Sequence, residues 1–97
     1  MRIYLSLPIT GQENKAREKA SEVSQMLRSA GHEVVNPFDL PCDKPLPEWI
    51  DWMCVDLYAL YGCDAIYLCE GWQFSKGCRI EASFAKENDK QFMYENK

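Results

Sequence analysis

The chain has 97 residues and a formal net charge of −4, with 46% hydrophobic and 27% charged residues. This length predicts one domain, residues 1–97, with a modest core, and the acidic balance argues against a protein that binds nucleic acid polymers. Because no apolar run could span a membrane and no signal-peptide pattern is present, we expect a cytoplasmic protein with no membrane partner.

The first third of the chain predicts a strand, a helix and a second strand. Residues 2–6 (RIYLS) are almost continuously apolar and predict a central strand, which a Pro/Gly-punctuated loop over 7–11 follows. Residues 12–30 have the spacing of an amphipathic helix that Gly31 ends, and residues 33–36 (EVVN) predict the second strand. The helix is expected to turn inward Ala16, Ala20, Val23, Met26, Leu27 and Ala30, and outward Glu13, Lys15, Arg17, Glu18 and Lys19.

A proline-rich loop and a second helix follow. Residues 37–45 (PFDLPCDKP) predict no regular element, and a long loop in a small domain is more often functional than decorative. Pro47 suits the first turn of a helix over 47–61, which Gly62 ends. Its apolar face is expected to hold Ile50, Met53, Leu57, Leu60 and Tyr61. Asp56 lies on the shoulder of that face, either as an interfacial acid bonded to a neighbouring loop or as a functional carboxylate.

The last third predicts a buried strand at 65–69 (AIYLC), a helix at 77–88 and a short strand at 91–94. Ser75 is a good N-cap for this helix. Glu81 is expected on its apolar arc, where it is either a structural carboxylate with a partner, the sign of a misplaced helix start, or a functional acid in a crevice. In the functional case the helix dipole would help to keep Glu81 ionised, and Gly77 would let a ligand approach the backbone.

The alternation of strands and helices predicts an α/β fold with a parallel sheet of about four strands and helices on both faces. Ligands bind such sheets beyond the carboxyl ends of the strands, where loops 7–11, 36–46 and 69–76 are expected, and Asp56 and Glu81 would have to converge there. Neither GxGxxG nor GxxxxGK[ST] is present. The sequence Ser75-Lys76-Gly77 offers a helix N-terminus for one phosphate, although many ordinary helix caps look the same.

No metal or cofactor site is predicted. The five cysteines form no CxxC pair, their spacings match no zinc pattern, and Cys54, Cys63, Cys69 and Cys78 are expected to act as small core residues. The single histidine, His32, is most simply a turn residue.

Five segments of the chain occur in one characteristic order: IYLSLPITG (3–11), GHEVVNP (31–37), Asp56-Leu57, CDAIYL (63–68) and S-x-G-x-x-x-E (75–81). Together they resemble the nucleoside 2-deoxyribosyltransferase-like superfamily, which includes deoxyribosyltransferases and nucleoside 5′-monophosphate N-glycosidases. The resemblance implies a flavodoxin-like, three-layer fold over most of the chain. It also implies cleavage or transfer of the N-glycosidic bond of a nucleoside or its monophosphate.

The same resemblance implies roles for individual residues. Glu81 would be the nucleophile that forms a covalent glycosyl-enzyme, Asp56 would assist as acid/base or hold the sugar hydroxyls, and Tyr4 would position the glutamate. A serine at the position of Ser75 resembles the phosphate-binding relatives, whereas an aspartate there would repel a phosphate. The predicted substrate-binding residues are Ser6, Pro8, Gly11, Trp72, Ser75 and Gly77. Trp72 is the candidate for stacking on the base. The phosphate-binding arginine that some relatives carry after the first strand has no match, since Thr10 stands near that place.

Two alternatives remain open: a nucleotide-binding module of the same fold without turnover, and an accessory interaction domain whose acids are structural. The presence of both Asp56 and Glu81 favours the enzyme, whereas the end of the chain soon after its fourth predicted strand favours the alternatives. The small core and the aromatic candidates Trp49, Trp52 and Tyr58 predict a homodimer through helix 47–61.

Overall fold

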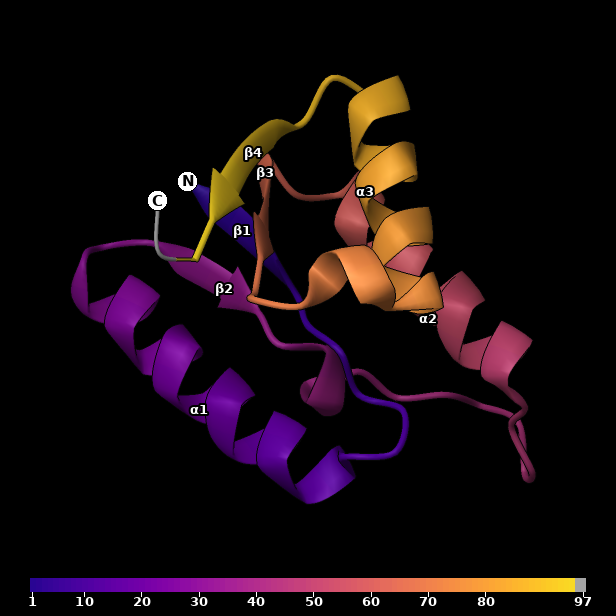
Figure 1. The fold of residues 1–97 in the computed structure, drawn as a ribbon. Helices are drawn as coiled ribbons and strands as arrows, with labels where there is room; N and C mark the ends of the chain where they lie inside the picture. The colour runs from indigo at the N-terminus through magenta and orange to yellow at the C-terminus, as the bar shows by residue number, and fades with distance from the viewer. Residues whose placement is uncertain (96–97) are drawn as a thin grey trace.

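Four strands form one parallel sheet in the order β2-β1-β3-β4 in the computed structural model, which describes residues 1–95. The strands are β1 (Arg2–Ser6), β2 (Glu33–Val35), β3 (Ala65–Leu68) and β4 (Gln91–Tyr94). The helices are α1 (Glu13–Ser29), α2 (Trp49–Tyr61) and α3 (Lys76–Glu87), with short 3-10 turns η1 (Pro37–Asp39) and η2 (Trp72–Phe74). Helix α1 lies on one side of the sheet and α2 and α3 on the other, which confirms the predicted flavodoxin-like, three-layer fold (Figure 1).

The two faces of the sheet carry different cores because successive strand residues point to opposite sides. Ile3 and Leu5 of β1 belong to the core beneath α1, whereas Tyr4 packs with Ile66 and Leu68 beneath α2 and α3. Since Ser6 follows Tyr4 by two positions, its side chain lies on the same face as Tyr4. The fold therefore turns both hydroxyl groups of β1 toward α3.

The order of the strands creates a crevice between the carboxyl ends of β1 and β3. Strand β2 lies on one side of β1 in the sheet and β3 lies on the other side of β1. The loops that follow β1 and β3 therefore diverge at this point. The two loops still approach each other, because a Cβ atom added to Gly71 would lie 3.6 Å from Cγ of Pro8. Helix α3 starts directly after the second of these loops and carries its N-terminus to the crevice.

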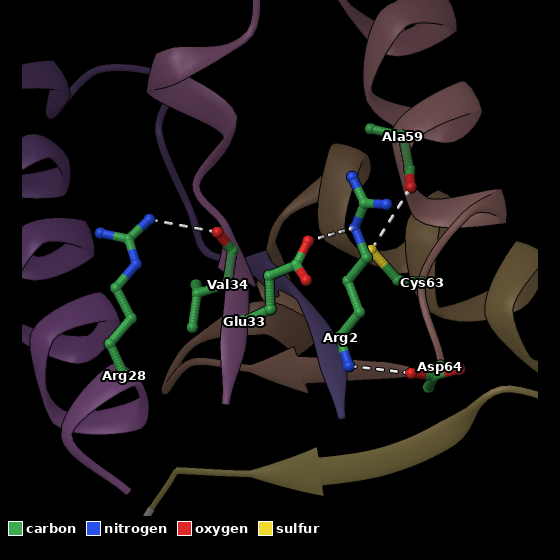
Figure 2. Close-up of polar contacts among 7 residues, drawn as sticks. All are labelled: Arg2, Arg28, Glu33, Val34, Ala59, Cys63 and Asp64. Atoms are coloured by element: carbon green, nitrogen blue, oxygen red, sulfur yellow. Dashed lines mark hydrogen bonds and ion pairs between the residues drawn. The ribbon is translucent and has the colours of Figure 1, made fainter. Parts of the chain in front are cut away.

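The opposite edge of the sheet is closed by polar contacts around Arg2 (Figure 2). The backbone N–H of Arg2 donates to the carboxylate of Asp64 over 2.8 Å, and its guanidinium pairs with Glu33 at 3.3 Å. Figure 2 also shows the thiol of Cys63 donating to the carbonyl of Ala59 in α2. These contacts join the amino ends of three strands and leave the carboxyl edge as the open one.

The predicted elements all occur, with ends that shift by one or two residues. Pro47 does not lie in the first turn of α2, because the Asp51 carboxylate accepts from the N–H of Glu48 over 2.8 Å and makes Glu48 the N-cap. Strand β2 stops at Val35 because the side chain of Asn36 accepts from the N–H of Phe38 and begins η1, inside the segment expected to be irregular.

Several residues expected in the core are exposed. Met26 is 53% exposed and Ala30 is also exposed, since the buried stripe of α1 ends at Leu27; Ser24 is buried in that stripe instead. Ile50 and Tyr61 are exposed because α2 is buried through Met53 and Leu60. Cys54 is exposed on α2, whereas Cys63, Cys69 and Cys78 are buried as predicted. Within residues 1–95, no helix is long and apolar enough to cross a membrane, and no cluster of three or more acidic, His or Cys side chains is placed to hold a metal.

Candidate active site

Glu81 is a buried carboxylate held by two hydroxyl groups of β1. Its side chain is only 5% exposed. The hydroxyl of Tyr4 donates to Oε2 over 2.7 Å, and the hydroxyl of Ser6 donates to Oε1 over 2.6 Å. Each carboxylate oxygen therefore has a short, charge-assisted hydrogen bond that fixes its position.

The first turn of α3 sets the position of Glu81 along the helix. Ser75 is the N-cap, and its hydroxyl accepts from the backbone N–H of Cys78 over 3.3 Å. From this start the 3.6-residue period places Glu81 on the buried stripe with Cys78, Ala82 and Ala85. The predicted place of Glu81 on the apolar arc is confirmed, and the helix starts within one residue of its expected position.

The partners of Glu81 are hydroxyl groups rather than a cation. Among residues 1–95, no salt bridge reaches Glu81. Burial raises the pKa of Glu81 to about 7; the hydrogen bonds from Ser6 and Tyr4 lower it, and the nearby Asp56 charge raises it. Burial thus outweighs the two hydrogen bonds that favour the ionised form of Glu81.

Asp56 provides the second acid. It is half-buried on α2, and burial raises its pKa to about 6. Burial, followed by the charges of Glu81 and Asp56, raises the pKa of Tyr4 well above its usual value, so Tyr4 remains a hydrogen-bond donor at neutral pH. Two carboxyl groups with pKa values near neutrality, in different surroundings, can exchange protons and bear negative charge in turn.

A cavity of about 390 Å³ opens at the carboxyl edge of the sheet and contains both acids. Its volume lies within the range of small-molecule sites. Of the predicted site residues, the cavity brings together Tyr4, Asp56, Ser75, Gly77 and Glu81. Ser6 does not line the cavity but contacts Glu81 from the strand. Three segments that are distant in sequence, β1, α2 and the start of α3, thus meet around one pair of carboxyl groups.

Besides Ser6, three other predicted substrate-binding residues lie outside the cavity lining: Pro8, Gly11 and Trp72. Gly11 is exposed in the loop before α1 with a φ of 83°, and Pro8 lies against the turn at Gly71. Trp72, the candidate for stacking on the base, does not line the cavity. The left-handed conformation of Gly71 starts η2, and the Trp72 ring then packs against Tyr94 with a centroid distance of 6.2 Å.

The structure brings other aromatic and basic side chains to the cavity. Trp49 and Trp52 of α2 and Phe38 of η1 line it. Arg17 of α1, which we expected to face solvent, also lines it and places its guanidinium carbon 4.7 Å from the centre of the Phe38 ring. The sequence marked Trp49 and Trp52 as aromatic candidates for a dimer contact and the segment 37–45 as a long loop, but it did not predict that they line the cavity, because periodicity cannot place a loop against a helix face.

Comparisons with known proteins agree with this fold. A family model described as "Domain of unknown function (DUF4406)" matches residues 1–94. A search of curated protein sequences finds no match. The chain spans roughly two thirds of each of three solved structures that it resembles.

The first of these structures is the CMP N-glycosidase of Clostridium botulinum, with a TM-score of 0.66 and 19% identity over 97% of this chain and 67% of that one. The 2-deoxyribosyltransferase of Bacillus psychrosaccharolyticus has a TM-score of 0.74 and 21% sequence identity, over 97% of this chain and 71% of that one. The 2-deoxyribosyltransferase of Leishmania mexicana has a TM-score of 0.73 and 14% sequence identity, over 96% of this chain and 62% of that one. These likenesses confirm the nucleoside 2-deoxyribosyltransferase-like fold.

Proposed function

The chain belongs to the DUF4406 family, and from that premise and the geometry of its site we propose that it cleaves or transfers the N-glycosidic bond of a nucleoside or nucleoside 5′-monophosphate. The observation that carries the proposal is Glu81, a buried carboxylate that two hydroxyl groups hold at a cavity wall beside a second acid. A carboxylate that serves only the fold would be expected to face a cation or backbone donors. The solved structures that the chain resembles, one an N-glycosidase and two deoxyribosyltransferases, support the same chemistry.

In the proposed reaction, the ionised Glu81 attacks the anomeric carbon of the sugar. A carbon–oxygen bond to Glu81 forms as the carbon–nitrogen bond to the base breaks, and the base leaves with a proton from a neighbouring acid. Water, or a second base, then attacks the same carbon and releases Glu81. The hydrogen bonds from Tyr4 and Ser6 hold the attacking oxygen atoms in place throughout.

Asp56 is the proposed acid/base of this cycle, or the group that holds the sugar hydroxyls. A pKa of about 6 allows it to give a proton to the leaving base and take one from the attacking water near neutral pH. Both carboxyl groups also favour the positive charge that develops on the sugar in the transition state, and burial strengthens that interaction.

The N-terminus of α3 is the proposed place for a 5′-phosphate. Ser75 and Gly77 line the cavity there, at a helix N-terminus where backbone N–H groups point toward a bound anion, although that of Cys78 already donates to the Ser75 hydroxyl. Lys76 adds a cation close by, with its ammonium group 4.7 Å from the centre of the Trp49 ring. A phosphate at this position would leave the sugar over Glu81, one turn further along the helix.

The direct test is chromatographic detection of free base from a panel of nucleosides and 5′-monophosphates, with Glu81→Gln protein purified in parallel as the blank. Release of one base by the wild type above this blank supports the proposal and names the substrate. A folded protein that binds a nucleotide, shown by a thermal shift, but releases no base would instead be a nucleotide-binding module. No shift with any nucleotide would favour an accessory interaction domain.

We expect Ser75→Asp to lower kcat/KM for a 5′-monophosphate by roughly 10- to 100-fold, because the new carboxylate repels the phosphate. Aspartate is itself a good N-cap, so the start of α3 is retained. The matched control is Ser83→Asp, which adds the same charge at an exposed position of the same helix. Equal losses on the unphosphorylated nucleoside would mean that Ser75 does not contact a phosphate.

We also propose that the protein forms a homodimer through α2. Tyr58 is 85% exposed and Ile50 is 57% exposed on this helix, and Trp49 and Trp52 are also exposed. Aromatic side chains are enriched at protein–protein contacts. Light scattering at micromolar concentration is expected to give the mass of two chains, and Tyr58→Glu is expected to give one. A monodisperse wild-type monomer would contradict the dimer.

A further inference from the structure

We propose that a second, polar groove on the α1 side of the sheet binds a phosphate group, either free or carried by a small molecule. The groove measures about 650 Å³ and lies between α1 and the segment that follows β2. Residues of α1 form one wall, and Asn36, Phe38 and Asp39 form the other. This inference is independent of the glycosidic chemistry proposed for the cavity.

Two arginines give the groove a positive character within a chain of net charge −4. Arg28 is exposed, and it donates from Nη2 to the carbonyl of Val34 over 3.1 Å, which holds its guanidinium at β2 (Figure 2). Arg17 is held by the ring of Phe38. Each guanidinium has further N–H groups that can donate, and among residues 1–95 Asp39 is the only acidic side chain that lines the groove.

Packing does not explain why Ser24 is buried. It lies on the buried stripe of α1 between apolar neighbours, is 1% exposed, and lines the groove. Within residues 1–95 its hydroxyl has no hydrogen-bond partner. A buried hydroxyl without a partner is destabilising, and its oxygen atom is closed to solvent, so a slight shift of the groove wall would let an oxygen atom of a ligand supply that partner.

The polar groups of the groove favour an acceptor-rich anion over other ligands. The side-chain oxygen of Asn36 already accepts from the N–H of Phe38 over 3.0 Å, so the amide N–H₂ group of Asn36 is the part of its side chain that can donate to a ligand. Ser21 and Ser29 add hydroxyl groups along α1. Two guanidinium groups, an amide donor and several hydroxyls match the oxygen atoms of a phosphate.

The groove and the cavity share a wall. Arg17 and Phe38 line both, so the stacked pair separates the two spaces. The α3 N-terminus with Ser75 lines only the cavity, and Ser24 and Arg28 line only the groove. The two phosphate positions can therefore be tested by separate substitutions.

The experiment is a titration of ¹⁵N-labelled protein with inorganic phosphate and, in a second series, glycerol 3-phosphate, each at constant ionic strength held with chloride. Amide signals of residues 24–29 and of Asn36, Phe38 and Asp39 are expected to shift in a saturable manner. Tighter binding of glycerol 3-phosphate would identify a phosphorylated small molecule as the ligand, and equal binding would identify free phosphate.

Substitutions separate the groove from other anion sites. Arg28→Gln is expected to weaken phosphate binding about 10-fold and Ser24→Ala about 3-fold, whereas Ser75→Asp leaves these shifts unchanged. Arg79→Gln is the matched control, because Arg79 also donates to a backbone carbonyl, that of Gln73 over 3.1 Å, but lies outside the groove.

Ser24→Ala also separates binding from folding. Removal of an unpaired buried hydroxyl is expected to leave the free energy of unfolding unchanged or higher, so weaker phosphate binding by this variant cannot come from partial unfolding. Shifts that do not saturate, or that persist unchanged in both Arg28→Gln and Ser24→Ala, would overturn the proposal.

Discussion

Glu81→Gln is expected to lower base release by at least about a thousandfold, because an amide cannot act as the attacking nucleophile. Glutamine keeps the volume of the side chain, and its carbonyl and amide groups can still bond to the hydroxyls of Tyr4 and Ser6. Substrate affinity should therefore fall far less than kcat. The measurement is single-turnover release of free base by chromatography, at enzyme concentrations above that of substrate.

Glu87→Gln is the matched control, since it makes the same chemical change at an exposed position of α3. Its rate should equal that of the wild type. Retention of more than about a tenth of the wild-type rate in Glu81→Gln would mean that Glu81 is not the nucleophile. The role would then pass to Asp56, the other acid of the cavity.

The position of Glu81 was predictable because burial along a helix follows a period of 3.6 residues. Once Ser75 and Gly77 mark the start of α3, the period alone places Glu81 on the buried stripe. The alternation of side chains along β1 is equally predictive. It places Tyr4 and Ser6 on one face of the sheet, which is the face that α3 covers. Local periodicity thus accounts for the carboxylate and both of its hydrogen-bond donors.

The aromatic and basic walls of the cavity were not predictable in this way. The orientation of Trp72 depends on the left-handed Gly71 and on contact with Tyr94 at the end of β4, 22 residues later in the chain. The approach of Arg17 to Phe38 depends on how the loop after β2 lies against α1. Neither contact produces a periodic pattern in the sequence, because each joins a loop to an element that is distant along the chain.

The burial that shapes the site also has a cost in stability. Glu81 has a pKa of about 7 in the folded protein and 4.5 as its ordinary value, so the folded state holds more protons between these two pH values. The contribution of this group to stability is therefore complete below about pH 4.5 and is lost as the pH rises through 7. Above that pH the folded protein must keep a carboxylate ionised in a buried site without a cation.

Glu81→Gln is accordingly expected to raise the free energy of unfolding by roughly 1–3 kcal/mol at pH 8.5, with a difference that shrinks toward pH 5. Urea unfolding, followed by tryptophan fluorescence across this pH range, measures the difference, and Glu87→Gln should follow the wild type at every pH. A gain in stability together with a loss of turnover is what a carboxylate retained for its chemistry should show. If Glu81→Gln instead destabilises the protein equally at all pH values, Glu81 serves the fold as the acceptor for Tyr4 and Ser6, and the proposed nucleophile loses its physical basis.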